Sequence, residues 1–104
     1  MPTPISSLKP VIDQIRELLS AEKTYLFSVK RDEVNGEITE FSLGVITPRV
    51  DGTNRNAVIK EVYLAVDSEI SYNLFLYSPD EWERLTEDSS SFASRILRKG
   101  TRIE

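Results

Sequence analysis

The chain has 104 residues, 39% of them hydrophobic and 29% charged, which is typical of one soluble globular domain. We therefore expect a single domain over residues 1–104. The net charge of −4 argues against non-specific binding to nucleic acid, so no nucleic-acid partner is expected. The sequence contains neither Cys nor His. Disulfides, thiolate metal sites, His-ligated zinc and catalysis by an imidazole base are therefore excluded.

No segment approaches the ~20 apolar residues that a membrane-spanning helix needs, so no membrane partner is expected. Residues 1–9 contain no long apolar run, and we expect no signal peptide. Together with the absence of Cys, these features lead us to expect a cytoplasmic protein.

The first predicted element is a helix over residues 7–21. Ser6 or Ser7 is expected to cap it, and Pro10 falls in the first turn, where its missing N–H costs nothing. Its apolar residues recur at helical spacing and predict one buried face, formed by Leu8, Val11, Ile12, Ile15, Leu18 and Leu19.

Two strands joined by a tight turn should follow. Residues 24–30 predict a strand with Tyr25, Phe27 and Val29 on one face and Leu26 on the other. Residues 31–37 predict a hairpin turn, because they contain Asn-Gly. Residues 38–47 predict the return strand, whose alternating apolar side chains are Phe41, Leu43 and Val45.

Residues 48–54 predict a loop, and residues 55–66 fit either a helix or a strand. We favour the helix because a crossover is needed to place residues 70–77 parallel to the preceding strand. Residues 70–77 then form a third strand, which we expect to be the most buried of the three.

The C-terminal third predicts two short helices. Ser78 is expected to cap the first, with Pro79 at its first position and Glu81 as the carboxylate of a capping box. Trp82 and Leu85 should face inward. A break over residues 86–91 separates this helix from a second one over residues 92–99, which ends at Gly100. The fold class expected from these elements is α/β or α+β, a small mixed sheet with helices packed on it.

This order, together with the sequence from Asn73 to Gly100, resembles the minimal nucleotidyltransferases of the polymerase-β-like group. The resemblance implies a Gly-Ser turn that holds a triphosphate, and three aspartates on two strands that bind Mg²⁺. Two Mg²⁺ ions would then stabilise attack on the α-phosphate.

The residues that match the Gly-Ser turn depart from it. The family's Tyr-Leu-Phe-Gly-Ser corresponds to residues 25–29, so Ser28 and Val29 replace the Gly-Ser pair. Lys30 corresponds to the basic residue that follows. These three positions would be the remnant of a nucleotide-binding turn.

The three aspartates also have altered counterparts. The paired aspartates correspond to Glu40 and Ser42, and the third corresponds to Asn73. One carboxylate of three is retained, and a single carboxylate cannot offset the charge of two Mg²⁺ ions. We therefore expect no metal or other cofactor. If the remnant is real, the three side chains should lie together on one face of the sheet.

The resemblance suggests a protein that binds rather than catalyses. Family members often pair with a small helical protein in two-component systems of the toxin–antitoxin kind, and we expect such a partner; a homodimer is also left open. The alternative is an active nucleotidyltransferase whose Mg²⁺ site has drifted to Glu40 with Glu37 or Asp32. A third reading is an interaction module whose likeness is coincidental. The absence of a parallel pairing between the strands at 38–47 and 70–77 would favour that reading.

Three other sets of residues have an ordinary structural reading beside a functional one. The first is a set of carboxylates around the hairpin, read as a solvated tip or as a cation site: Asp32, Glu33, Glu37 and Glu40. The second is a set of aromatic residues, read as core or as a binding surface: Tyr63, Tyr72, Phe75 and Tyr77. The third is a set of cations, read as a solvated helix end or as a basic patch: Arg95, Arg98, Lys99 and Arg102.

Overall fold

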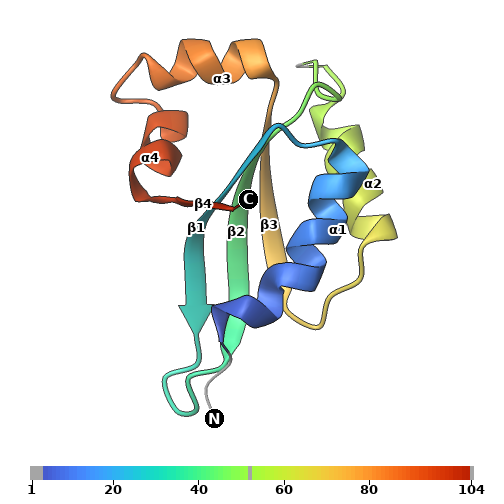
Figure 1. The fold of residues 1–104 in the computed structure, drawn as a ribbon, viewed down its shortest axis with the longest axis vertical. Coiled ribbons are helices and arrows are strands. Elements are labelled where there is room, and N and C mark those ends of the chain that lie inside the picture. Colours follow the sequence, from blue (N-terminus) through green and yellow to red (C-terminus); the bar gives the residue numbers. More distant parts are fainter. Residues whose placement is uncertain (1–3, 52, 104) are drawn as a thin grey trace.

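The computed structural model describes residues 4–51 and 53–103 and places helices on both faces of a mixed sheet (Figure 1). In chain order, the elements are a 3-10 turn (Ile5–Leu8), α1 (Lys9–Leu19), β1 (Lys23–Arg31), β2 (Ile38–Ile46), α2 (Arg55–Ala65), β3 (Ser71–Tyr77), α3 (Pro79–Thr86), α4 (Phe92–Lys99) and β4 (Thr101–Ile103). The expected α+β class is confirmed.

The four strands lie in the order β3-β2-β1-β4. β1 is antiparallel to both β2 and β4, whereas β2 and β3 are parallel. The helix favoured over residues 55–66 is confirmed as α2, and it makes the crossover between the two parallel strands. The strands at 38–47 and 70–77 are therefore paired in parallel. The absence of this pairing would have favoured the reading in which the likeness to the family is coincidental.

Each face of the sheet has its own core. α1 and α2 cover one face, where the alternating residues of β2 are buried together with the apolar face of α1 (Figure 1). α3 and α4 cover the opposite face, where Trp82, Ile96 and Ile46 are buried. The strand with the most buried residues is β2, because it lies between two neighbours. The expectation that β3 would be the most buried strand is wrong, since β3 lies at an edge of the sheet.

Because of a β-bulge, the side chains of β1 do not lie on the faces of the sheet that the sequence predicted. The register with β2 shifts between Leu26 and Ser28, so Phe27 is an extra residue in the ladder. Tyr25 and Phe27 pack in the core under α3 and α4, but Val29 packs in the core under α1 and α2. The prediction that all three share a face is wrong because it assumed an uninterrupted two-residue period.

The N-terminus of α1 also differs from the prediction. Leu8 occupies the N-cap position without a side-chain cap, because residues 5–8 form a 3-10 turn before the helix begins. The Ser7 hydroxyl instead donates to the carbonyl of Pro4 at 2.6 Å. The buried face is as expected, with Ile12, Ile15 and Leu19 almost fully buried.

The caps of α3 and α4 use serine side chains. The Ser78 hydroxyl accepts from the amide of Glu81 at 3.2 Å, which confirms the predicted cap. The Ser91 hydroxyl accepts from the amide of Ser94 at 3.0 Å in the same way. The second half of the predicted capping box is not present, because the Glu81 carboxylate pairs with Arg55 of α2 instead.

Gly100 ends α4, but not by the left-handed conformation that often ends a helix. Its backbone is extended, with φ of −78°. A Cβ here would lie 2.6 Å from the carbonyl oxygen of Ile96 and 3.1 Å from the Cβ of Tyr25. Gly is therefore required where the chain crosses close to β1. Directly after it the chain forms β4 beside β1, a strand that the sequence did not predict.

Candidate functional site

The three positions that match the family's aspartates lie together. In the parallel register Ser42 is the partner of Asn73, and Glu40 is two residues away on the same face of β2. The Asn73 side-chain amide donates to the Glu40 carboxylate at 2.7 Å and to the Ser42 hydroxyl at 3.4 Å. The sequence-predicted cluster therefore exists as a hydrogen-bonded group on two adjacent strands.

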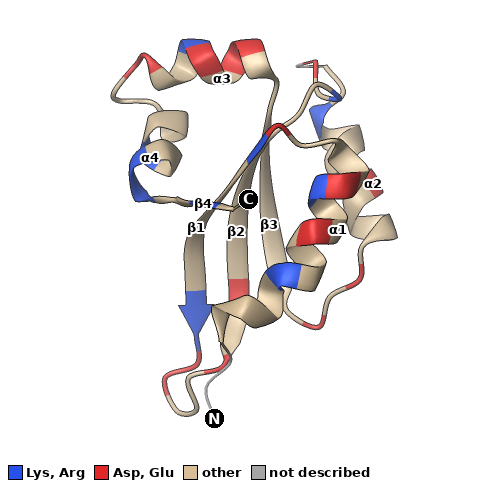
Figure 2. Ribbon diagram, in the orientation of Figure 1, with Lys and Arg blue, Asp and Glu red and all other residues tan. Residues whose placement is uncertain are grey.

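Lys30 belongs to the same group. Its ammonium lies 3.1 Å from the Glu40 carboxylate, across the β1–β2 ladder. Figure 2 shows the basic end of β1 beside the acidic segment of β2. The hydrogen bond from Asn73 and the hydrogen bond and charge of Lys30 hold the pKa of the Glu40 carboxyl below its ordinary value. Glu40 is thus an ionised carboxylate that already has a cation as its partner.

This arrangement does not fit a Mg²⁺ pair. The only carboxylate among the three positions is neutralised by Lys30, and the amide donors of Asn73 point at it. Within residues 4–51 and 53–103, no three carboxylates gather as a metal-ligating group. The Asp32 carboxylate accepts from the amides of Val34 and Asn35, and so it is used in shaping the hairpin turn.

The positions that match the Gly-Ser turn lie in β1, directly after the bulge at Phe27. Ser28, Val29 and Lys30 pair with Ser42, Phe41 and Glu40 along β2. Successive N–H groups of an extended strand point in opposite directions, so they do not converge on one phosphate. Moreover, Val29 packs against the buried core. Ser28 is the register partner of Ser42, which places it next to the cluster around Glu40.

An aromatic group that the sequence analysis did not identify borders the polar cluster. Phe27, Phe75 and Phe92 pack against one another. The Phe27 ring centroid lies 5.3 Å from that of Phe75 and 5.7 Å from that of Phe92, and the last two lie 5.0 Å apart. Phe92, at the start of α4, remains 41% exposed. The bulge that turns Phe27 toward this face could not be seen in the strand pattern. The part of the sheet beyond these rings carries Ser28, Lys30, Glu40, Ser42 and Asn73.

The aromatic set noted in the sequence does not form one surface. Tyr72 faces the core under α1 and α2, and its hydroxyl donates to the carbonyl of Val66 at 2.8 Å. Tyr63 packs beside it. Phe75 and Tyr77 lie on the opposite face of β3. Alternation along one strand places Tyr72 and Phe75 on opposite faces, which the interpretation as a single binding surface overlooked.

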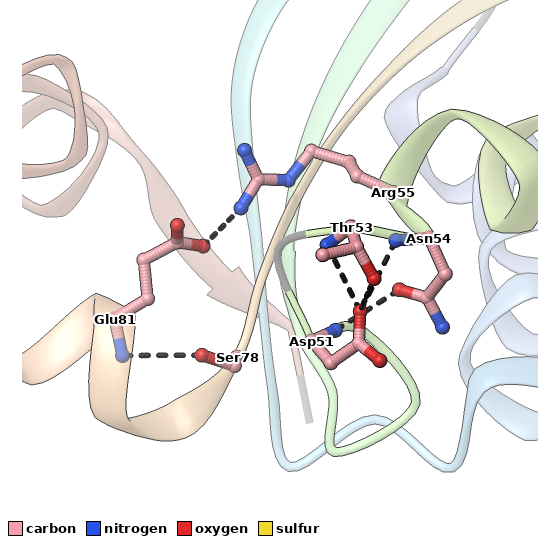
Figure 3. Close-up of polar contacts among 6 residues, drawn as sticks. All are labelled: Asp51, Thr53, Asn54, Arg55, Ser78 and Glu81. Carbon is pink, nitrogen blue, oxygen red and sulfur yellow. Dashed lines mark hydrogen bonds and ion pairs between the residues drawn. The ribbon is translucent and has the colours of Figure 1, made fainter.

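A second polar group joins the N-termini of α2 and α3 (Figure 3). The Arg55 guanidinium donates to the Glu81 carboxylate, and its buried Nε has no acceptor. Asp51 accepts from the amides of Thr53 and Asn54 at 2.9 and 3.1 Å, and these bonds hold its pKa below the ordinary value. Burial first, and then the charge of Glu81, raise the pKa of Tyr77. This group fixes the loop before α2 and ties α2 to α3.

The four cations near the C-terminus are exposed, three on α4 and one on β4. The Arg98 guanidinium donates to the carbonyl of Ser89 at 3.3 Å, which braces the turn between α3 and α4. Basic residues in the last turn of α4 also complement the helix dipole.

The structure is therefore an α+β fold. One face of its sheet carries a hydrogen-bonded polar cluster in which the carboxylate of Glu40 is balanced by the ammonium of Lys30. In comparisons with known proteins, neither a family model nor a curated protein nor a solved structure matches the chain. Among the residues that the structure describes, no helix has the length and apolar character needed to cross a membrane.

Proposed function

We propose that this protein is a non-catalytic binding module of nucleotidyltransferase-like descent, and that it recognises a small helical protein. Its binding surface is the aromatic–polar face, which we define as Phe27, Phe75 and Phe92 with the neighbouring residues Ser28, Ser42 and Asn73. The nature of the partner rests on the two-component pairing that the resemblance implies. The observation that carries the proposal is the exposed Phe92 ring, which packs on Phe27 and Phe75 on the sheet face that also carries the ion pair of Glu40 with Lys30.

The lack of catalysis follows from charge. Catalysis through two Mg²⁺ ions requires several carboxylates that face the same point. Here a single carboxylate is compensated by Lys30 and held by Asn73. A divalent cation would have to displace Lys30 and would still lack anionic ligands.

Binding by the same face follows from its composition. Aromatic residues are enriched in the cores of protein interfaces, and polar groups around them provide hydrogen bonds and orientation. Phe92 is supported by two other rings and is therefore presented in a fixed position. An amphipathic helix could cover Phe92 with its apolar side and contact Ser28 or Ser42 with its polar side.

The proposal is tested by affinity purification from the source cells with the chain as bait. A specific helical partner should co-purify, and purified partner and bait should reconstitute the complex. Phe92→Ser should weaken the reconstituted complex at least tenfold, as expected for a central aromatic residue. Val34→Ser is the control, because Val34 is 95% exposed on the hairpin, away from the face. If both variants bind the partner equally well, the aromatic–polar face is not the binding surface.

Titration with Mg²⁺ and ATP tests whether the chain has a working nucleotidyltransferase site, because such a site must bind both. We expect no saturable binding at sub-millimolar concentrations. Saturable binding that is lost on Glu40→Ala would instead support the drifted-site nucleotidyltransferase.

A further inference from the structure

The outer edge of β3 has no strand paired with it and has an unusual composition. β3 is the last strand of the sheet and pairs only with β2. Its seven residues, Ser71–Tyr77, include no charged residue and no Pro. Proteins normally protect such edges with charges, Pro or bulges, because an open edge can pair with another strand.

The other open stretches of this sheet are protected. β4 has three residues and carries Arg102. The part of β1 beyond its pairing with β4 contains the bulge at Phe27 and ends in Lys30 and Arg31. β3 is therefore the one edge among the described strands that is both long and uncharged.

The backbone groups on this edge can be assigned. The carbonyl of Tyr77 accepts from the amide of Thr47 at the end of β2. Because directions alternate along a strand, Phe75 and Tyr77 point toward β2, and Tyr72, Leu74 and Leu76 point outward. The Tyr63 hydroxyl donates to the outward carbonyl of Tyr72 at 3.0 Å. Among the described residues, the groups left open on this edge are therefore the N–H of Tyr72 and the N–H and C=O groups of Leu74 and Leu76.

We propose that two copies of this chain pair through their β3 edges, antiparallel and about a twofold axis that passes by Phe75. In this register Leu74 of one copy lies opposite Leu76 of the other, so two N–H and two C=O groups from each copy are satisfied in four hydrogen bonds. The cleft between α2 and β3, lined by Arg55, Ile59 and residues 74–77, is where the second strand enters.

A second copy is favoured over a foreign strand because the open groups are self-complementary. The carbonyl of Tyr72, which already accepts from the Tyr63 hydroxyl, lies outside the paired region. The residue opposite it in the second copy would be Ser78, and β3 has ended before that residue. Phe75 of each copy would face the other in a non-hydrogen-bonded pair, with Cα atoms ~4.5 Å apart. Facing aromatic residues stabilise such a pair, and β3 itself carries no like charges that would oppose each other across the axis.

This pairing uses backbone groups that the proposed binding of a helical partner does not use, although Phe75 belongs to both surfaces. It uses the edge of β3, whereas the partner is expected on the face around Phe92. The two can be separated by substitution, because Phe92 lies on α4 and contributes nothing to the strand edge.

Analytical ultracentrifugation of the full chain over a wide concentration range tests the pairing. The interface is small, so we expect a monomer at low concentration and a dimer at high concentration. Phe75→Lys places two like charges opposite each other and should weaken the dimer by about tenfold or more. Phe92→Lys is the matched control, because it disturbs the same ring cluster but not the edge, and it should leave the dimer unchanged. A monomer at every concentration, or equal loss in both variants, would overturn the proposal.

Single-cysteine cross-linking tests the register without depending on Phe75→Lys being folded. The chain has no Cys, so each variant carries one thiol. The expected Cα separation at Phe75 lies within the range of disulfides, and Phe75→Cys should form a disulfide-linked dimer under mild oxidation. Val34→Cys, at an exposed hairpin position, should form far less. Equal cross-linking at both positions, or none at Phe75→Cys, would contradict the register. Cross-linking of a different protein to Phe75→Cys in cell extract that persists when Phe92→Lys is also present would favour a foreign strand.

Discussion

Glu40 receives donors from both neighbouring strands, and this should appear in its titration. Because the folded-state pKa is lowered, first by Asn73 and then by Lys30, the stabilisation by this group is present above the unfolded-state pKa. It is lost as the pH falls through the folded-state pKa. We expect Asn73→Val and Lys30→Met each to raise the Glu40 pKa toward its ordinary value. Carboxyl carbon NMR titration measures both, and unchanged values would contradict the hydrogen-bonded cluster.

Restoring the two missing carboxylates tests whether these positions can hold a metal. Ser42→Asp with Asn73→Asp would place three carboxylates together, with Lys30 compensating only one of them. Like-charge repulsion should destabilise the metal-free protein, and Mg²⁺ should restore part of the stability. Chemical denaturation with and without Mg²⁺ measures both effects. If the double variant is as stable as the parent and does not respond to Mg²⁺, the positions are not the remnant of a metal site.

The serine caps of α3 and α4 lead to a prediction about the stability of single elements. Ser78→Ala and Ser91→Ala should each reduce the free energy of unfolding by about 1 kcal/mol, because each hydroxyl accepts from a helix amide. Ser7→Ala should change it by less than ~0.5 kcal/mol, because this exposed hydroxyl caps no helix amide. Urea denaturation compares the three. A loss at Ser7 equal to that at Ser78 would contradict the observed start of α1.

The close packing at Gly100 leads to a second prediction about the free energy of unfolding. Gly100→Ala would force the new methyl group against the carbonyl of Ile96 and against β1. We expect a loss of about 1–3 kcal/mol, since backbone on both sides must move. Ala57→Gly, at an exposed position inside α2, is a useful comparison, because there the substitution should cost only about 1 kcal/mol through helix propensity. Thermal unfolding measures both, and a neutral Gly100→Ala would show that the crossing over β1 has room for a side chain.

At the scale of the whole molecule, the sequence was most informative where one period runs without interruption. The apolar spacing of α1, the alternation of β2 and the crossover over residues 55–66 were enough to predict the mixed sheet. The cluster of Glu40, Ser42 and Asn73 was also predicted, because the resemblance supplied the three positions and the strand period places residues 40 and 42 on one face. The bulge at Phe27, the Arg55–Glu81 pair and β4 were not predicted. Each depends on contacts between segments far apart in the chain, and a local pattern does not carry that information.

The two cores share one sheet, and this leads to the last prediction. Ile96 of α4 is fully buried against Gly44 of β2, and the neighbouring residue Leu43 is buried in the core on the other face. Loss of packing under α4 should therefore be transmitted through β2. We expect Ile96→Ala to cost about 2–5 kcal/mol. The denaturation midpoints followed by Trp82 fluorescence and by far-ultraviolet circular dichroism should shift together. If the fluorescence transition alone moves to lower denaturant, α3 and α4 unfold separately, and the sheet does not couple the two cores.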